Sequence, residues 1–319
     1  MSDSPQNRPI ISVAISPRIS SDREKLQRAL SVLIQDDPTL QIKTESVTGQ
    51  TTLGGMSDLH LEECCNRILL EFNIPLDVWG LKVIYLESIR RHAEGEGKYI
   101  RQTGGFINYA HCKLRIEPND PGKGNKFINC IKGDALPRQY VQSIDEGVQK
   151  ALEEGIRAGH PMVDINITLI DGSHHETGSN EMSFKIAGSM AFKDAARKAL
   201  PILLEPVMDV KITVPEEHMG TIIGDLNSRS GRIEGIEQTT TGSQVINATV
   251  PLAEMLGYGK DIHSGTQGRA QHSMRFARYE AAPYRGGPND EGPYITANKP
   301  TRPKTGSGLA AARWDLEVE

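Results

Sequence analysis

The stretch ISVAISPRISSDREKLQRALSVLI, Ile11–Ile34, places an alternating strand directly before an amphipathic helix. Ile11–Ser16 alternates apolar and small residues, as a half-buried strand does. Ser20-Ser21-Asp22 then supplies side chains that cap helix N-termini. Apolar residues follow at i, i+4, i+7 and i+8, which predicts a helix that buries one face: Leu26, Leu30, Leu33 and Ile34. Asp36-Asp37-Pro38 marks its predicted end.

The residues that follow complete a βαββαβ order. Two strands are predicted at Leu40–Ser46 and Gln50–Leu53, around a Thr-Gly turn. A second helix is predicted from Ser57, and Val83–Leu86 is predicted as the closing strand. The buried side of the second helix is expected to carry Leu61, Ile68, Leu69 and Phe72. This order is that of the ferredoxin-like split motif.

The same order returns near the C-terminus with a different sequence. Met208, Val210, Ile212 and Val214 alternate as a strand, and Pro215 opens a helix that runs toward Asn227. Strands are predicted at Arg232–Gln238, Gln244–Val250 and Arg269–Tyr279. A helix between the last two of these strands is predicted to begin at Pro251. A second ferredoxin-like domain is therefore predicted.

The middle of the chain, Glu87–Leu200, follows a different pattern. Strands are predicted at Lys113–Glu117 and Asp164–Ile170, and helices at Ser143–Ala158 and Asn180–Leu200. This mixture indicates an α+β domain. Two polar stretches, Gln102–His111 and Asp171–Glu181 (DGSHHETGSNE), lie between these patterns and are interpreted as projecting connections. Recognition residues concentrate in such connections.

Length, charge and hydropathy indicate the number of domains and exclude several classes of protein. A chain of 319 residues exceeds what one hydrophobic core normally organises, so two or three domains are expected. The formal net charge of −5 argues against a protein that coats nucleic acid, although local phosphate contacts remain compatible with it. Residues 1–9 are polar and lack the apolar core of a signal peptide, and no apolar run could span a bilayer. The sequence therefore predicts a cytoplasmic protein.

The four cysteines, Cys64, Cys65, Cys112 and Cys130, contain no C-x-x-C pair. In a reducing compartment they are interpreted as free, buried thiols. His60 and Cys64 stand one helical turn apart, which suits metal binding, but two ligands do not make a zinc site.

DGSHHETGSNE allows two hypotheses from different classes. His174, His175 and Glu176 are residue types that bind metal or transfer protons, so a metal-dependent enzyme is one hypothesis. The His-His-x-x-Glu arrangement of the imidazoleglycerol-phosphate dehydratases has Gly178 in its glutamate position here, and no second histidine motif follows. The dense donors and acceptors favour the other hypothesis, a loop that contacts a large partner. The sequence also contains neither a G-x-x-x-x-G-K-[ST] phosphate loop nor a G-x-S-x-G nucleophile elbow.

Several successive stretches resemble the last three domains of bacterial elongation factor G. Among them are TGQTTLGGMSDLHLE, QTGGFINYAH, LPRQYVQSIDEGVQ, AGHPMVDINITLIDGSHH and VPLAEMLGYGKDIHSGTQGRA. The resemblance runs in order from about Ile10 to Ala282. It implies an N-terminal extension at 1–9, a ferredoxin-like domain III at 10–86, a domain IV similar to domain 2 of ribosomal protein S5 at 87–203, and a ferredoxin-like domain V at 204–283. Residues 284–319 are rich in Pro and Gly and are interpreted as a disordered tail.

In that family, domain IV enters the decoding region behind the moving tRNA–mRNA during translocation. The resemblance implies a monomeric, ribosome-binding chain whose partners are rRNA of the decoding and GTPase-associated regions, tRNA and mRNA. The family's GTPase domain, with its GTP and magnesium, would lie upstream, so no catalytic residue, cofactor or metal is expected in this chain. The sequence leaves open whether the chain is part of a longer factor or a stand-alone paralogue.

Site residues follow from the resemblance position by position. The first domain IV tip loop corresponds to Gly104, Gly105, Phe106, Ile107 and Asn108, and the second to His174, His175 and Glu176. In domain V, Arg229 and Arg269 are the implied rRNA contacts. The first loop departs from the family's Gly-Gly-Arg-Gly-Gln-Tyr-Gly-His, because Phe106 replaces the arginine and Ile107 a glycine. A phenyl ring cannot replace the guanidinium fork, although it can stack on a base.

Two further alternatives stay open. The departures in the first tip loop allow a specialised or non-translocating paralogue. An interaction module whose tail, 284–319, recruits a partner is the third possibility.

Overall fold

A computed structural model describes residues 8–44, 51–103, 106–131, 136–175, 178–239 and 242–283. The chain divides into two compact units. Among the described residues, the middle unit comprises Tyr85–Leu204 and 281–283, and the flanking unit comprises 8–84 and Glu205–Glu280. Both α and β elements occur in each unit, which confirms the predicted α+β class.

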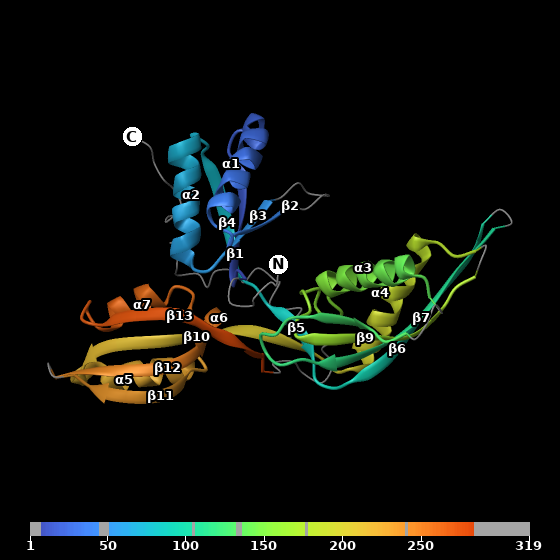
Figure 1. Cartoon of the computed structure of the whole chain (residues 1–319). Coiled ribbons are helices and arrows are strands. Elements are labelled where there is room, and N and C mark those ends of the chain that lie inside the picture. The colour runs from blue at the N-terminus through green and yellow to red at the C-terminus, as the bar shows by residue number, and fades with distance from the viewer. Residues whose placement is uncertain are drawn as a thin grey trace, which may run out of the picture. The chain divides into compact units, whose positions relative to one another are not determined.

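The first part of the flanking unit is a βαββαβ motif, as predicted. Its four strands form one antiparallel sheet in the order β2-β3-β1-β4 (Figure 1). Ser57 caps α2 by accepting a hydrogen bond from the backbone N–H of His60, 3.1 Å away. The elements are β1 (Ile11–Pro17), the short 3-10 helix η2 (Ser20–Asp22), α1 (Arg23–Asp36), β2 (Gln41–Thr44), β3 (Thr51–Gly55), α2 (Asp58–Phe72) and β4 (Leu76–Val83).

Three details of this prediction are wrong. Ser20–Asp22 forms the short 3-10 helix η2, and Asp22, at the N-cap position of α1, makes no side-chain cap hydrogen bond. The strand predicted at Val83–Leu86 lies earlier: β4 ends at Val83, and Leu86 begins another strand in the middle unit. Ile34 is 39% exposed, because the buried side of α1 follows Leu26, Ala29, Leu30 and Leu33. One residue beyond Leu33, Ile34 is turned by about 100° around the helix axis.

The second part of the flanking unit repeats this topology. Its strands form a sheet in the order β11-β12-β10-β13, which matches β2-β3-β1-β4 strand for strand. The boundaries of β11 agree with the prediction residue for residue. The elements are β10 (Pro201–Pro215), α5 (Glu216–Ser228), β11 (Arg232–Gln238), β12 (Ser243–Pro251), α6 (Leu252–Met255), α7 (Tyr258–Gly265) and β13 (Gln271–Ala281).

The middle unit contains a sheet with the strand order β6-β7-β9-β8, in which only β8 and β9 are parallel. Helices α3 and α4 pack on this sheet (Figure 1), and the buried face of β7 consists of Ala110, Cys112, Leu114 and Ile116. Strand β5 pairs with the start of β10 instead. The elements are β5 (Leu86–Ile89), β6 (Ala93–Thr103), β7 (Phe106–Pro118), β8 (Lys126–Asn129), α3 (Arg138–Glu154), β9 (Ile165–Ser173) and α4 (Glu181–Lys198).

Two predictions for the middle unit are corrected. Helix α3 begins at Arg138, five residues before the predicted Ser143, because Pro137 stands at its N-cap. Gln102–His111 is not a connection: it lies almost entirely in β6 and β7, which pair up to Thr103 and Phe106. Only Gly104 and Gly105 separate the two strands in sequence.

Three of the four cysteines, Cys64, Cys65 and Cys112, are buried as predicted, whereas Cys130 is exposed. Burial raises the pKa of Cys64 to about 11, so this thiol is protonated at neutral pH. Both imidazole nitrogens of His60 have partners within the protein: Nε2 lies 2.9 Å from Asp37 Oδ2, and Nδ1 accepts a hydrogen bond from the backbone N–H of Met56.

Candidate functional site

Strands β6 and β7 form a ribbon that extends beyond the rest of the sheet (Figure 1). Pairing between them continues to Thr103 and Phe106, whereas pairing of β7 with β9 stops at His111 and Ser173. The end of the ribbon is therefore two-stranded. Its β6 side exposes Lys98, Ile100, Arg101 and Gln102, and Ile100 is 57% exposed.

Beyond the end of β9, the connection between β9 and α4 lies beside β7 and forms hydrogen bonds with it. The backbone N–H of Tyr109 donates to the carbonyl of Gly178 at 2.7 Å, and the Ser179 hydroxyl donates to the carbonyl of Tyr109 at 2.7 Å. Asn180 Nδ2 donates to Asn108 Oδ1 at 2.9 Å. The structure thus brings residues of both predicted tip loops together, although they lie about 70 positions apart in sequence. We call Asn108, Tyr109, His174, His175 and Gly178–Asn180 the tip.

Both predicted histidines are exposed at the tip. The carbonyl of His175 accepts hydrogen bonds from the N–H groups of Gly178 and Ser179, at 3.3 and 3.1 Å. His174 lies with its ring centroid 6.0 Å from that of Tyr140, and Tyr140 in turn stacks on the buried Phe184 at 4.4 Å. The exposed end of the tip is therefore connected to the core of the middle unit.

Other predicted tip residues are described only in part. Gly104, Gly105 and Glu176 lie outside the described residues, and Phe106 and Ile107 are described as the first backbone positions of β7. The His174–His175–Glu176 set for metal binding stays untested because of Glu176. Within the described ranges, no group of three His, Cys, Asp or Glu side chains is placed to hold a metal ion. The predicted tail, 284–319, also lies outside them.

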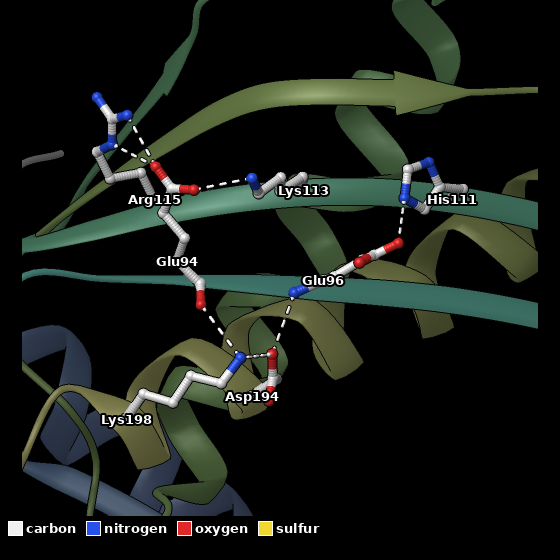
Figure 2. A network of polar contacts seen from close by, with 7 residues as sticks. All are labelled: Glu94, Glu96, His111, Lys113, Arg115, Asp194 and Lys198. Atoms are coloured by element: carbon white, nitrogen blue, oxygen red, sulfur yellow. Dashed lines mark hydrogen bonds and ion pairs between the residues drawn. The ribbon is translucent and has the colours of Figure 1, made fainter.

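A polar network holds the base of the ribbon to α4 (Figure 2). Glu94 accepts hydrogen bonds from Arg115 and Lys113, each at 2.8 Å, and its backbone carbonyl lies 3.4 Å from Lys198 Nζ. Asp194 bridges Lys198 Nζ at 2.6 Å and the backbone N–H of Glu96 at 3.2 Å. Farther along, His111 Nε2 lies 2.9 Å from Glu96 Oε1, and its Nδ1 lies 3.2 Å from Ser173 Oγ. These contacts anchor the base of the ribbon to α4 and to the end of β9.

The network makes the stability of the folded state depend on pH. Hydrogen bonds from Lys113 and then Arg115 lower the pKa of Glu94 to about 2. The ordinary carboxyl pKa is about 4.3. The ionised Glu94 carboxylate therefore stabilises the folded state fully above that pH, and this stabilisation is lost as pH falls toward 2. In thermal melts, Glu94→Gln should lower the melting temperature at pH 7, and the difference from the unsubstituted chain should vanish near pH 2. A difference that stays constant from pH 7 to 2 would contradict this assignment.

Arg229 has an intramolecular role that sequence reasoning missed. Its guanidinium donates to Asp225, to the carbonyl of Glu254 at 2.7 Å and to Asp261 at 2.8 Å. It also lies over the ring of Tyr258, 4.9 Å from the centroid. The side chain is only 18% exposed, so it joins the end of α5 to α6 and α7. Its rRNA contact stays a prediction, and only part of the guanidinium remains for it.

Arg269, the other predicted contact in this part of the chain, is 46% exposed. It pairs with Glu217, and one of its terminal nitrogens lies 2.6 Å from His218 Nε2. Because a guanidinium can only donate, His218 Nε2 accepts this hydrogen bond. The exposed part of Arg269 leaves it accessible to an anion.

Three family models and a solved structure match this chain. Models of elongation factor G match three successive stretches: its domain III at residues 7–79, its domain IV at 81–200 and its C-terminus at 202–285. A crystal structure of a protein from Thermus thermophilus is similar, with 36% sequence identity and a TM-score of 0.64. That match covers 86% of this chain and 41% of the Thermus chain. No helix within the described ranges is long and apolar enough to cross a bilayer.

Proposed function

Because the chain belongs to the elongation factor G family, we propose that it is the ribosome-binding part of a translation factor and acts in tRNA–mRNA translocation through its tip. The order of the three matched domains along residues 7–285 supports this assignment. GTP hydrolysis would depend on a GTPase domain, which none of the three matches covers. The chain itself would act without catalysis or cofactor, as a cytoplasmic monomer.

The observation that carries the proposal is the exposed, two-part tip at the end of the anchored ribbon. Its exposed His174 and His175 can stack on bases or bond to them, as imidazoles and aromatic rings do in RNA recognition. Lys98 and Arg101 are exposed on the adjoining ribbon and supply positive charge for phosphates. The proposed partners are accordingly rRNA of the decoding and GTPase-associated regions, tRNA and mRNA.

Domain V would add rRNA contacts, and the two predicted arginines differ in how well they suit that role. The exposed Arg269 can reach a phosphate, whereas Arg229 first serves the hydrogen bonds between α5 and α7. We therefore propose Arg269 as the stronger contact.

Ribosome binding tests the proposal directly. The full chain should co-sediment with ribosomes, and its affinity should fall steeply as salt rises, because phosphate contacts release counterions. His175→Ala should weaken binding about tenfold, the equivalent of one lost hydrogen bond of ~1.4 kcal/mol, with an unchanged melting temperature because the side chain is exposed.

His92→Ala is the matched control, since His92 is an exposed histidine of the same unit outside the tip, and it should bind as the unsubstituted chain does. Absence of binding at every salt concentration would reject a ribosomal role and favour the specialised paralogue. A large drop in melting temperature for His175→Ala would identify His175 as a packing residue instead.

A further inference from the structure

The hydroxyl of Ser179 joins the two halves of the tip. Its oxygen accepts a hydrogen bond from the backbone N–H of His175 at 2.9 Å, and it donates its proton to the backbone carbonyl of Tyr109 at 2.7 Å. The backbone N–H of Tyr109 returns a bond to Gly178 at 2.7 Å. A single side chain thus fixes the backbone of His175 relative to strand β7.

Only a side chain that donates and accepts at one atom can make this bridge. A hydroxyl has one proton to donate and two lone pairs to accept with, so serine and threonine satisfy both backbone groups at once. Alanine would leave the N–H of His175 and the carbonyl of Tyr109 without their partner. Because His175 is exposed, water can hydrate its N–H in such a variant. The fold is therefore expected to survive the loss, while the geometry of the tip loosens.

Contacts with Tyr140, which stacks on a core residue, fix the position of Ser179. The Tyr140 hydroxyl donates to the carbonyl of Ser179 at 3.2 Å, while the Tyr140 ring stacks on Phe184 at 4.4 Å. Phe184 is fully buried in α4, and Tyr140 stands in the first turn of α3. The position of Ser179 is thus set by two helices that also pack on the sheet.

We propose that Ser179 is a positioning residue: it holds His175 against the ribbon, so that the two halves of the tip meet RNA as one pre-ordered surface. This inference rests on the function proposed above and names what organises that same site. A loop that is already ordered loses less conformational entropy when it binds, and this increases affinity without a new contact. Ser179 need not touch RNA to have this effect.

The test combines Ser179→Ala with His175→Ala in the full chain, using purified ribosomes as the probe. Ser179→Ala should weaken binding about fivefold to tenfold, and Ser179→Thr should restore most of it. The dependence of affinity on salt should keep its slope, because no phosphate contact is removed. In the His175→Ala background, Ser179→Ala should add less than about twofold, because residues that act through one another are not additive.

Ser143→Ala is the matched control, since it removes a hydroxyl of the same unit that donates only to the carbonyl of Gln139 within α3. It should leave binding unchanged. Hydrogen exchange gives a readout that does not depend on ribosomes: in Ser179→Ala the amides of His175 and Tyr109 should exchange faster, while those of the core do not change.

Each outcome separates the two proposals. If His175→Ala weakens binding and Ser179→Ala does not, the positioning role is rejected and the proposed function stands. Equal and additive losses in the double variant would also reject it, because Ser179 would then act independently of His175. If neither variant changes ribosome binding but the amides of His175 and Tyr109 exchange faster in Ser179→Ala, Ser179 orders the loop and the proposed RNA role of the tip is wrong.

Discussion

Glu87→Ala should destabilise the middle unit by about 3–5 kcal/mol, because several backbone N–H groups lose a charged acceptor and each such hydrogen bond contributes about 1.5–3 kcal/mol. Glu87 lies in β5 and is fully buried. Its carboxylate accepts four backbone hydrogen bonds from the loop after α3. One oxygen takes the N–H groups of Ile156 and Arg157 at 2.9 and 3.0 Å, and the other takes those of Ala158 and His160 at 2.7 and 3.2 Å.

The backbone of Glu87 also forms hydrogen bonds with the segment that follows this loop. Its N–H donates to the carbonyl of Pro161 at 2.9 Å, and its carbonyl accepts from Val163 at 2.8 Å. Gly155 makes the loop possible, because its φ of +69° suits glycine and a Cβ there would lie 2.3 Å from the carbonyl oxygen of His160. Removing the carboxylate leaves four N–H groups of a partly buried loop without this acceptor. Each N–H group costs about 1–3 kcal/mol if nothing replaces the acceptor.

Chemical denaturation of three variants measures this effect. Glu87→Gln should fall between the unsubstituted chain and Glu87→Ala, because the amide keeps one accepting oxygen and turns an NH2 group toward two N–H donors. Glu153→Ala removes an exposed glutamate of α3 and should change the free energy of unfolding by less than about 0.5 kcal/mol. Equal stability of Glu87→Ala and Glu153→Ala would show that water replaces the carboxylate.

Local signals explain why most elements of the fold could be predicted. Helices are predicted to begin at Ser57 and Asn180, and in the structure both side chains cap a helix by accepting the N–H three residues on. Strand β4 escaped prediction because it is an edge strand that exposes Trp79, Gly80 and Leu81, and its pairing with β1 is interrupted by an irregularity. An interrupted, exposed edge has no clean alternation of apolar and polar residues.

The candidate site could be predicted only in part, for a related reason. The density of polar groups in DGSHHETGSNE indicated a contact loop, and the structure exposes His174 and His175 there. The partners that order the loop are distant in sequence: Ser179 bonds to Tyr109, 70 residues away, and Tyr140 bonds to Ser179, 39 residues away. Contacts of this kind depend on how strands and helices pack, and no short motif encodes them. Glu87 is a single acidic residue in YLESIRR and gives no local signal either.

Gly97→Ala should destabilise the middle unit by about 3 kcal/mol or more, at or above the upper end of what overpacking a core costs. Gly97 lies in β6 where the strand crosses α4, and a Cβ there would lie 2.0 Å from the carbonyl oxygen of Ala187 and 2.8 Å from the backbone nitrogen of Ala191. Both obstacles are backbone atoms, so no side chain can rotate away. Relief requires that β6 and α4 separate, which exposes the buried small residues between them.

Gly147→Ala should be equally harmful, because its Cβ would lie 2.0 Å from the carbonyl oxygen of Lys185 where α3 crosses α4. Gly224→Ala is the matched control: Gly224 lies within α5 and has no atom within 4 Å of its virtual Cβ. In that open helical position alanine should stabilise the flanking unit by about 0.5–1 kcal/mol. Calorimetry should therefore show melting transitions that move in opposite directions. A small, similar shift for all three variants would mean that β6 and α4 are not in close contact, and the tip would then lose the rigid base on which its role in RNA recognition depends.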